Sequence, residues 1–180
     1  KIIAILAVFT FVFVGLTYTN QSTTSNDSIY SKKFASSTSV DFNLLRDGDI
    51  IFQTSQSDQC KAIQLATKSI YSHCGIIFKE GNEFYVWEAV QPVKKTPLKS
   101  WIKHGENNHF VVKRLKNHDE VVTADVIFKM KSIGKSYLGK NYDLTFEWSD
   151  DRIYCSELVW KIYKQALGIE VGKLQKLKEF

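Results

Sequence analysis

Two apolar runs joined by a short polar turn place the strongest constraint on how this sequence can fold. Residues 72–78 and 84–90 are rich in Ile, Phe, Tyr, Val and Trp, and the turn residues 79–82 include Gly81. Runs of this kind around a glycine-containing turn predict an antiparallel hairpin. Loops of two residues or of four residues centred on Glu80 and Gly81 give the same register, in which paired residue numbers sum to 161 (78 with 83, 79 with 82).

The predicted register places His73 directly opposite Glu88. Facing side chains in an antiparallel pair have Cβ atoms about 4.5–5.5 Å apart, so an imidazole and a carboxylate can hydrogen-bond there. Glu88 would then fix the tautomer of His73 and stabilise its imidazolium form. A slip of one residue would put the two side chains on opposite faces. The alternative is a structural histidine, but the apolar neighbours of Glu88 make an unpaired carboxylate costly.

Cys155 lies near the start of a helix predicted over residues 153–167, which Gly168 ends. The first turn of a helix presents free N–H groups and the positive end of the helix dipole, which favours the reactive thiolate. Cys155 also shares a helical face with Val159, Ile162 and Ala166, so a core thiol is the competing interpretation. The acidic pair Asp150–Asp151 is expected to cap this helix.

The first 40 residues differ in composition from the rest. Residues 2–16 form an apolar run that follows Lys1 and is broken only by Thr10, which suits a signal peptide or an N-terminal membrane anchor over residues 1–19. Residues 20–40 are rich in Ser, Thr and Asn and predict a flexible tether. Residues 41–180 form the globular domain. We therefore expect an exported protein that is secreted, periplasmic or anchored to the membrane.

Charge and cysteine content exclude several classes. The net charge of +5 is not gathered into a basic stripe, so no nucleic-acid partner is expected. The three cysteines cannot all pair, and Cys60 and Cys74 are expected to be plain buried thiols. The spacing of His104 and His109 does not fit a helical zinc pair, and these residues and His118 are expected in loops or at the surface. Neither a metal nor a cofactor is predicted.

Other predicted elements alternate between strands and helices. They are strands over residues 50–53 and 109–115, a helix from the Ser57–Asp58 cap to about Ser69, a turn or short helix over 98–103, and a helix over 121–133 that Gly134 ends.

Five segments in a fixed order resemble one known family. They are residues 45–52, 72–77, 87–89, 142–144 and 154–159. Together they resemble the YiiX/YebB-like family, in the circularly permuted branch of the NlpC-type papain-like cysteine hydrolases, over roughly residues 42–170. The order of His73, Glu88 and Cys155 along the chain matches the permuted branch. Cys74 departs from the aliphatic residue expected at its position.

The resemblance implies a small α+β domain, with a nucleophile helix packed on an antiparallel sheet. It assigns Cys155 as nucleophile, His73 as base and Glu88 as the orienting residue. The implied chemistry is acyl transfer through a thioester, with the Cys155 backbone N–H and one more donor, for which Tyr142 is the candidate, as the oxyanion site. The expected activity is hydrolysis of amide bonds, including those of cell-wall peptides.

Two other functions compete with amide hydrolysis. One is lipid acyl transfer or lipid hydrolysis. The apolar N-terminal run and Trp101 and Trp148, which are expected to be exposed, are compatible with it. The expected substrate is therefore a peptide or a lipid acyl group. The other is a non-catalytic ligand-binding domain. Association with a membrane or cell wall is compatible with all three.

Overall fold

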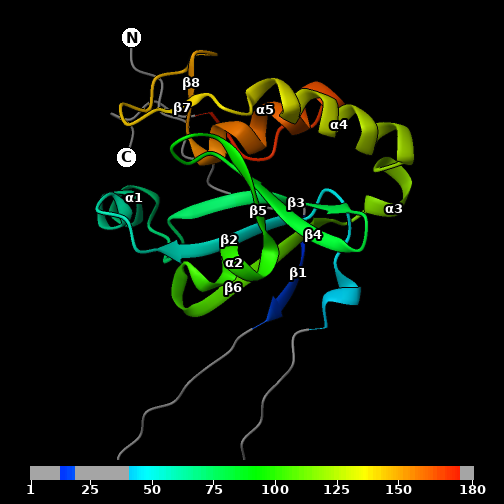
Figure 1. Ribbon diagram of the computed structural model, residues 1–180, viewed down its shortest axis with the longest axis horizontal. Helices are drawn as coiled ribbons and strands as arrows, with labels where there is room; N and C mark the ends of the chain where they lie inside the picture. The colour runs from blue at the N-terminus through cyan, green and yellow to red at the C-terminus, as the bar shows by residue number, and fades with distance from the viewer. Residues whose placement is uncertain (1–12, 19–40, 175–180) are drawn as a thin grey trace, which may run out of the picture.

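The computed structural model describes residues 13–18 and 41–174. Their main feature is an antiparallel sheet covered by helices (Figure 1). The six strands follow the order β1-β6-β2-β3-β4-β5. Their bounds are β1 (Phe13–Tyr18), β2 (Ile50–Ser55), β3 (His73–Glu80), β4 (Glu83–Glu88), β5 (Lys94–Pro97) and β6 (Gly105–Leu115). Two short strands, β7 (Asn141–Tyr142) and β8 (Arg152–Ile153), form a separate parallel pair.

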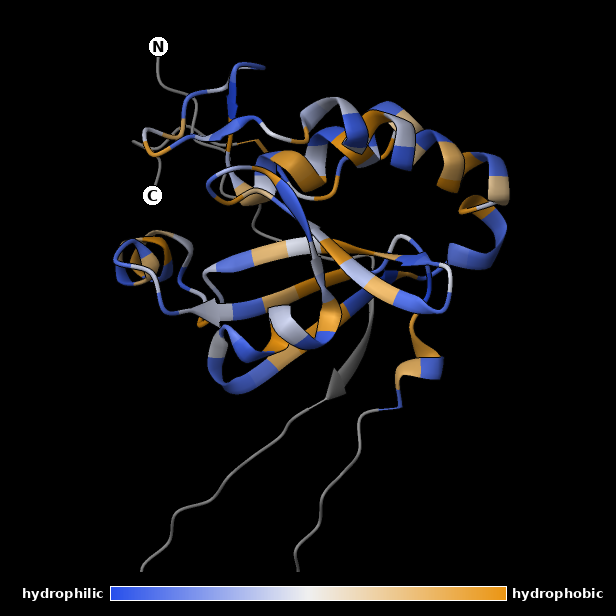
Figure 2. Cartoon of the chain, viewed as in Figure 1, coloured by the Kyte–Doolittle hydropathy of each residue, from blue (hydrophilic) through white to orange (hydrophobic). Residues whose placement is uncertain are grey.

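The helices divide between the two faces of the sheet. Helices α4 (Ala124–Tyr137) and α5 (Cys155–Leu167) cover one face, and the short α2 (Leu98–Lys103) covers the other (Figure 1). The remaining helical segments are the 3-10 turn η1 (Phe42–Leu44), α1 (Cys60–Thr67) and α3 (His118–Val121). Apolar and polar residues alternate in bands along α4 and α5 (Figure 2), as expected for helices with one face on a core. The α+β class is confirmed.

Strand alternation builds a separate core on each face. In β3, Cys74, Ile76 and Phe78 pack under α4 and α5, whereas Ile77 packs on the other side with Leu98 and Trp101 of α2. Successive residues of a strand point to opposite faces, so one apolar run supplies both layers. His73 has the parity of Ile77, and its side chain therefore belongs to the α2 face.

The hairpin forms where predicted, but its register is shifted by two residues. Ile76 pairs with Trp87 and Glu80 with Glu83, so paired numbers sum to 163 rather than 161. The two-residue loop is Gly81–Asn82, with φ of 62° at Gly81. Glycine reaches this conformation without strain, which favours it as the first loop residue. An even shift keeps every side chain on its predicted face, so His73 and Glu88 become diagonal rather than direct neighbours.

Gly134 does not end a helix, contrary to the prediction. Helix α4 continues through it to Tyr137, so the helix runs three residues further than Gly134. A Cβ at Gly134 would lie only 2.5 Å from Cε3 of Trp87. The glycine therefore allows α4 to pack closely on the Trp87 indole of β4, which outweighs its poor helix propensity.

Three predicted side-chain environments are also wrong. Trp101 is fully buried and Trp148 is only partly exposed, with its ring against Trp160. His118 is 6% exposed, and its Nε2 lies 2.9 Å from the carbonyl oxygen of Asp47. Apolar packing and polar satisfaction in the core determine these positions, and neither follows from local sequence pattern.

Part of the N-terminal segment belongs to the sheet. The prediction placed residues 1–19 outside the fold, but Phe13–Tyr18 forms β1, which pairs along β6 from Phe13 with Leu115 to Tyr18 with Phe110. The other residues of that segment and the predicted tether over 20–40 lie outside the described residues, and the assignment as a signal peptide or anchor stays a prediction. Within residues 13–18 and 41–174, no helix has the length and apolarity needed to cross a bilayer.

Candidate active site

Cys155 is the first residue of α5; the sequence predicts it in the first turn of a helix that starts two residues earlier, at Ile153. The helix begins after Tyr154, whose backbone is extended, and the Glu157 carboxylate accepts a hydrogen bond from the Tyr154 N–H at 3.4 Å. Gly168 ends the helix in the left-handed region. The acidic pair does not cap α5; Asp150 instead accepts a hydrogen bond from Lys161 Nζ at 2.7 Å. The Cys155 thiol thus lies at the positive end of a helix of 13 residues.

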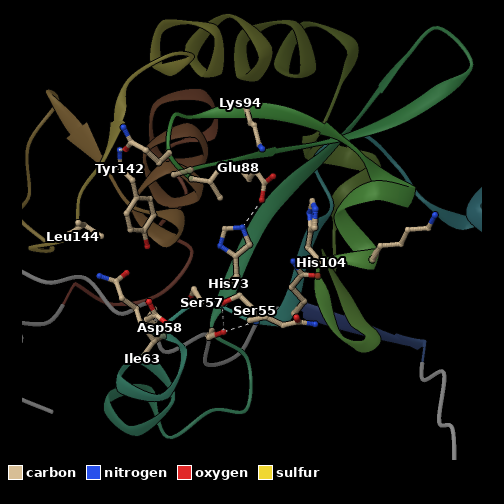
Figure 3. A pocket seen from close by; sticks show the side chains of 18 residues that line it. Ser55, Ser57, Asp58, Ile63, His73, Glu88, Lys94, His104, Tyr142 and Leu144 are labelled. Carbon is tan, nitrogen blue, oxygen red and sulfur yellow. Dashed lines mark hydrogen bonds and ion pairs between the residues drawn. The ribbon is translucent and has the colours of Figure 1, made fainter.

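The side chains of Glu88 and His73 hydrogen-bond to each other, as predicted, although the two residues are diagonal in the sheet. His73 Nε2 and Glu88 Oε2 are 2.6 Å apart, and the two side chains are only 10% and 5% exposed. The pair can be followed in Figure 3, where a dashed line joins the ring to the carboxylate. Because His73 uses Nε2 toward Glu88, its Nδ1 remains for Cys155.

Two further donors hold Glu88 in place. Thr96 Oγ1 donates to Oε1 at 2.5 Å, and Trp101 Nε1 donates to Oε2 at 2.8 Å. The Trp101 indole also stacks on the His73 ring, with centroids 5.9 Å apart. Sequence reasoning missed both residues. Thr96 lies in β5 opposite Val86, two residues from Glu88 along β4, and no strand was predicted there.

Cys155 and His73 meet at the end of the sheet. His73 opens β3, so its ring lies where a group from the α5 face can reach it, and both side chains line one cavity. Burial favours neutral His73, but the hydrogen bonds and charges of Cys155 and Glu88 outweigh it and raise the pKa of His73 from 6.5 to about 10. His73 is therefore an imidazolium at neutral pH.

The pKa of Cys155 is shifted in the opposite direction. A hydrogen bond from the Cys74 thiol lowers the pKa of Cys155 well below its ordinary value, burial opposes this, and His73 and the Cys74 backbone lower it further. The pKa of Glu88 is likewise lowered: burial opposes its charge, but the His73 hydrogen bond prevails. The three groups form a thiolate, an imidazolium and a carboxylate in sequence, which is the electrostatic state of an activated cysteine nucleophile.

Cys155 is also part of the core, as the competing interpretation expects. It is 7% exposed and packs in the cluster under α4 and α5 together with Val159, Ile162 and Ala166. All three cysteines are buried and free. Cys74 belongs to the same buried cluster as Cys155, because the side chain of the second residue of β3 faces α5.

Tyr142 lies beside the same sulfur. Burial and the Cys155 charge raise the pKa of Tyr142, and its hydroxyl hydrogen-bonds to Cys155. The Tyr142 backbone N–H donates to Gln91 Oε1 at 2.7 Å, which ties β7 to the loop after β4. The structure therefore brings together all four residues that the sequence analysis named: Cys155, His73, Glu88 and Tyr142.

Two cavities meet at His73. The larger, of about 670 Å³, is lined mainly by polar side chains, among them Ser55, Asp58, Lys94 and His104 (Figure 3). The smaller, of about 310 Å³, is mainly apolar and reaches Cys155; its wall includes Phe52, Tyr71, Val111 and Phe146. Ile63, Ser72 and His73 line both. A substrate can therefore extend to either side of the reactive groups.

Comparison with known proteins agrees with this geometry. Residues 44–180 match the sequence profile of a family described as permuted papain-like amidase enzyme, YaeF/YiiX, C92 family. The chain belongs to this family. An uncharacterised protein YiiX of Escherichia coli K12 is 56% identical over 133 residues, which are 74% of this chain and 64% of that relative. The chain thus spans less than two thirds of the relative's length.

A solved structure of the family is also similar. The crystal structure described as metalloprotein yiiX from Escherichia coli O157:H7 is 55% identical, with a TM-score of 0.71 over 75% of this chain and 73% of that chain. In residues 13–18 and 41–174 of the present chain, no group of three or more His, Cys, Asp or Glu side chains is arranged to hold a metal ion. Membership of a papain-like amidase family supports a cysteine hydrolase type of activity.

Proposed function

We propose that this protein hydrolyses amide bonds with Cys155 as nucleophile, His73 as acid and base, and Glu88 as the orienting carboxylate. The observation that carries the proposal is the 2.6 Å contact between His73 Nε2 and Glu88 Oε2, with Cys155 in the wall of the same cavity as His73. Cys155 is the first residue of α5, and His73 lies between the two cavities. Family membership supports the same reaction class.

Acylation begins from the ion pair. The Cys155 thiolate attacks the amide carbonyl carbon, and the negative charge moves to the carbonyl oxygen. The C–N bond then breaks, the Cys155 thioester forms, and the His73 imidazolium donates its Nδ1 proton to the departing amine. Glu88 stays ionised and keeps the ring oriented throughout.

Deacylation uses the same groups in reverse. Neutral His73 takes a proton from a water molecule, which attacks the thioester carbonyl. The carboxylic acid leaves, and the Cys155 thiolate and His73 imidazolium are restored. The Cys155 backbone N–H and the Tyr142 hydroxyl serve as oxyanion donors in both half-reactions; supporting Tyr142 is the effect of the Cys155 charge on the pKa of its hydroxyl.

The apolar cavity favours a second candidate function. Its aromatic and aliphatic wall ends at Cys155, which suits an apolar acyl group joined to the nucleophile during lipid hydrolysis or acyl transfer. Leu65 and Ile70, which are 80% and 63% exposed, lie on and just after α1. Trp101, which the sequence analysis linked to lipid binding, does not support this function because it is buried.

Turnover of a matched substrate panel tests the proposal. The panel contains cell-wall peptides, N-acyl amides with short and long chains, and the corresponding lipid esters, and the wild type is compared with Cys155→Ala. We expect amide cleavage by the wild type only, with an acyl group trapped on Cys155 by acid quenching and mass spectrometry. Detergent-stimulated ester turnover without amide cleavage would favour the lipid function. Neither turnover nor a thioester on any substrate would favour a non-catalytic binding domain.

Export remains part of the proposal. Supporting it are the apolar run over residues 2–16 and the Ser, Thr and Asn-rich segment over 20–40. Fractionation of cells that express the full chain tests it: recovery outside the cytoplasm is expected, and retention of all protein in the cytoplasmic fraction would contradict it.

A further inference from the structure

Cys74 and Cys155 form a thiol pair within the site. Cys74 is the second residue of β3 and Cys155 the first of α5, and both side chains belong to the buried cluster between these two elements. Both line the smaller cavity, although they are only 4% and 7% exposed. Small solutes can therefore reach the pair through that cavity. The third thiol, Cys60, is on α1 and is not part of the described wall of this cavity.

The two thiols differ in reactivity. Cys155 is the thiolate, whereas a hydrogen bond to Cys155, burial and the Cys155 charge raise the pKa of Cys74 well above its ordinary value. Oxidation by a peroxide follows thiolate character and access, so Cys155 reacts first. A neighbouring protonated thiol is the arrangement in which a sulfenic acid can be trapped as a disulfide.

We propose that Cys74 is a resolving cysteine, with which hydroperoxides convert Cys155 reversibly into an intramolecular disulfide. In the first step the Cys155 sulfur attacks one oxygen of hydrogen peroxide and the O–O bond breaks. Cys155 sulfenic acid forms, and the hydroxide takes a proton from the His73 imidazolium to become water. In the second step the Cys74 sulfur attacks the Cys155 sulfur, the S–O bond breaks, and hydroxide leaves with the Cys74 proton as water. Two thiols are oxidised and one peroxide is reduced to two waters.

The first step prepares the second. Two of the four causes that raise the pKa of Cys74, the hydrogen bond and the charge of Cys155, come from the Cys155 thiolate, and sulfenic acid is neutral. Oxidation of Cys155 therefore removes them and makes Cys74 easier to deprotonate and more nucleophilic. The contact supplies the high effective concentration of an intramolecular reaction. The disulfide would prevent irreversible oxidation of the nucleophile to sulfinic acid, and thiol reductants would restore it.

Peptide mass spectrometry of the full chain tests the proposal without reference to any hydrolase activity. The wild type, Cys74→Ala and the matched control Cys60→Ser are exposed to hydrogen peroxide, alkylated, digested and mapped before and after reduction. In the wild type and Cys60→Ser we expect a linked peptide pair containing Cys74 and Cys155, with the loss of two hydrogen atoms, that disappears on reduction. In Cys74→Ala we expect sulfinic acid at Cys155 that reductant does not reverse.

The wild-type map alone can overturn the proposal, even if the Cys74→Ala variant fails to fold. Sulfinic acid at Cys155 with no link to Cys74 would contradict it, as would a disulfide that joins Cys155 to Cys60 or to a second molecule instead. Equal rates of irreversible Cys155 oxidation in the wild type and in folded Cys74→Ala would do the same.

Discussion

Glu88 accepts three hydrogen bonds, from His73, Thr96 and Trp101, while only 5% of its side chain is exposed. A carboxylate in such a position is costly unless it is fully paired. The three hydrogen bonds compensate the negative charge of Glu88 and together fix the orientation of its carboxylate. The residue therefore sets both the tautomer and the orientation of His73, and through them the protonation state of Cys155.

Glu88→Gln should separate this role from packing. The amide keeps the shape of the side chain but carries no charge and cannot accept all three hydrogen bonds, so the imidazolium loses its partner. We expect kcat/KM for amide hydrolysis to fall by about 10²–10⁴-fold with the circular dichroism spectrum retained. Glu83→Gln, exposed on the same strand, is the control and should be close to wild type. A folded Glu88→Gln variant with unchanged kcat/KM would refute the role.

Cys74→Ala should raise the pKa of Cys155, because it removes the largest single cause of the lowering. The rate of alkylation by iodoacetamide, measured against pH, should shift its midpoint upward. Cys60→Ser, which leaves the pair intact, should not move it. An unshifted midpoint in Cys74→Ala would show that His73 and the helix terminus alone determine the thiolate.

At the scale of elements, the start of α5 carries a buried carboxyl of its own. Glu157 is fully buried, caps the Tyr154 N–H and lies 2.8 Å from Lys161 Nζ. Burial raises the pKa of Glu157 from 4.5 to about 7, and the Lys161 pair only partly opposes the shift. Since the folded pKa is the higher one, the native state holds this proton more tightly. The contribution of the protonated Glu157 to stability is fully present below pH 4.5 and is lost as the pH rises through about 7.

Glu157→Gln should therefore flatten part of the pH dependence of stability. The amide cannot ionise, so the fall in the free energy of unfolding between pH 4.5 and about 7 should be smaller than in the wild type. Urea unfolding at several pH values measures it. Glu170→Gln, an exposed carboxylate paired with Lys164, is the matched control. An identical slope in the wild type and Glu157→Gln would be inconsistent with a raised pKa.

The elements also show how far sequence pattern extends. Local rules located the hairpin and the end of α5 at Gly168, and placed the start of α5 two residues too early. The parity of His73 and Glu88 survived an error of two in the register. The burial of Trp101 could not be predicted, because its partner Glu88 lies 13 residues earlier in the chain. The two side chains meet only where α2 packs on the sheet. The prediction that Gly134 ends a helix was wrong for the same reason. The Trp87 indole, which leaves no room for a side chain at Gly134, belongs to another element.

At the scale of the whole molecule, a buried ion pair ties the centre of the sheet together. Asp49, fully buried just before β2, accepts hydrogen bonds at 2.7 Å from both Nε and Nη2 of Arg114 in β6. Tyr163 of α5 donates to the carbonyl oxygen of the neighbouring Gly48. Helix α5, which begins at Cys155, is thus attached to the same point that joins β2 to β6.

Arg114→Leu should destabilise the fold by about 3–5 kcal/mol, because it leaves the Asp49 carboxylate buried without its cation. Thermal and urea unfolding measure the change. Lys164→Ala, which removes one partner of an exposed ion pair with Glu170, should change stability by less than about 1 kcal/mol. Equal effects of the two substitutions would contradict the structural role of the buried pair.

The ion pair between Cys155 and His73 is the central claim, and the pH dependence of Cys155 alkylation tests it most directly. In the wild type the rate of reaction with iodoacetamide should already be high at neutral pH. The midpoint of its pH dependence should lie well below 9.0, the ordinary value of the thiol pKa. In His73→Ala the midpoint should move upward toward that value. A wild-type rate that rises only near 9.0, matches that of Cys60 and is unaffected by His73→Ala would contradict the account.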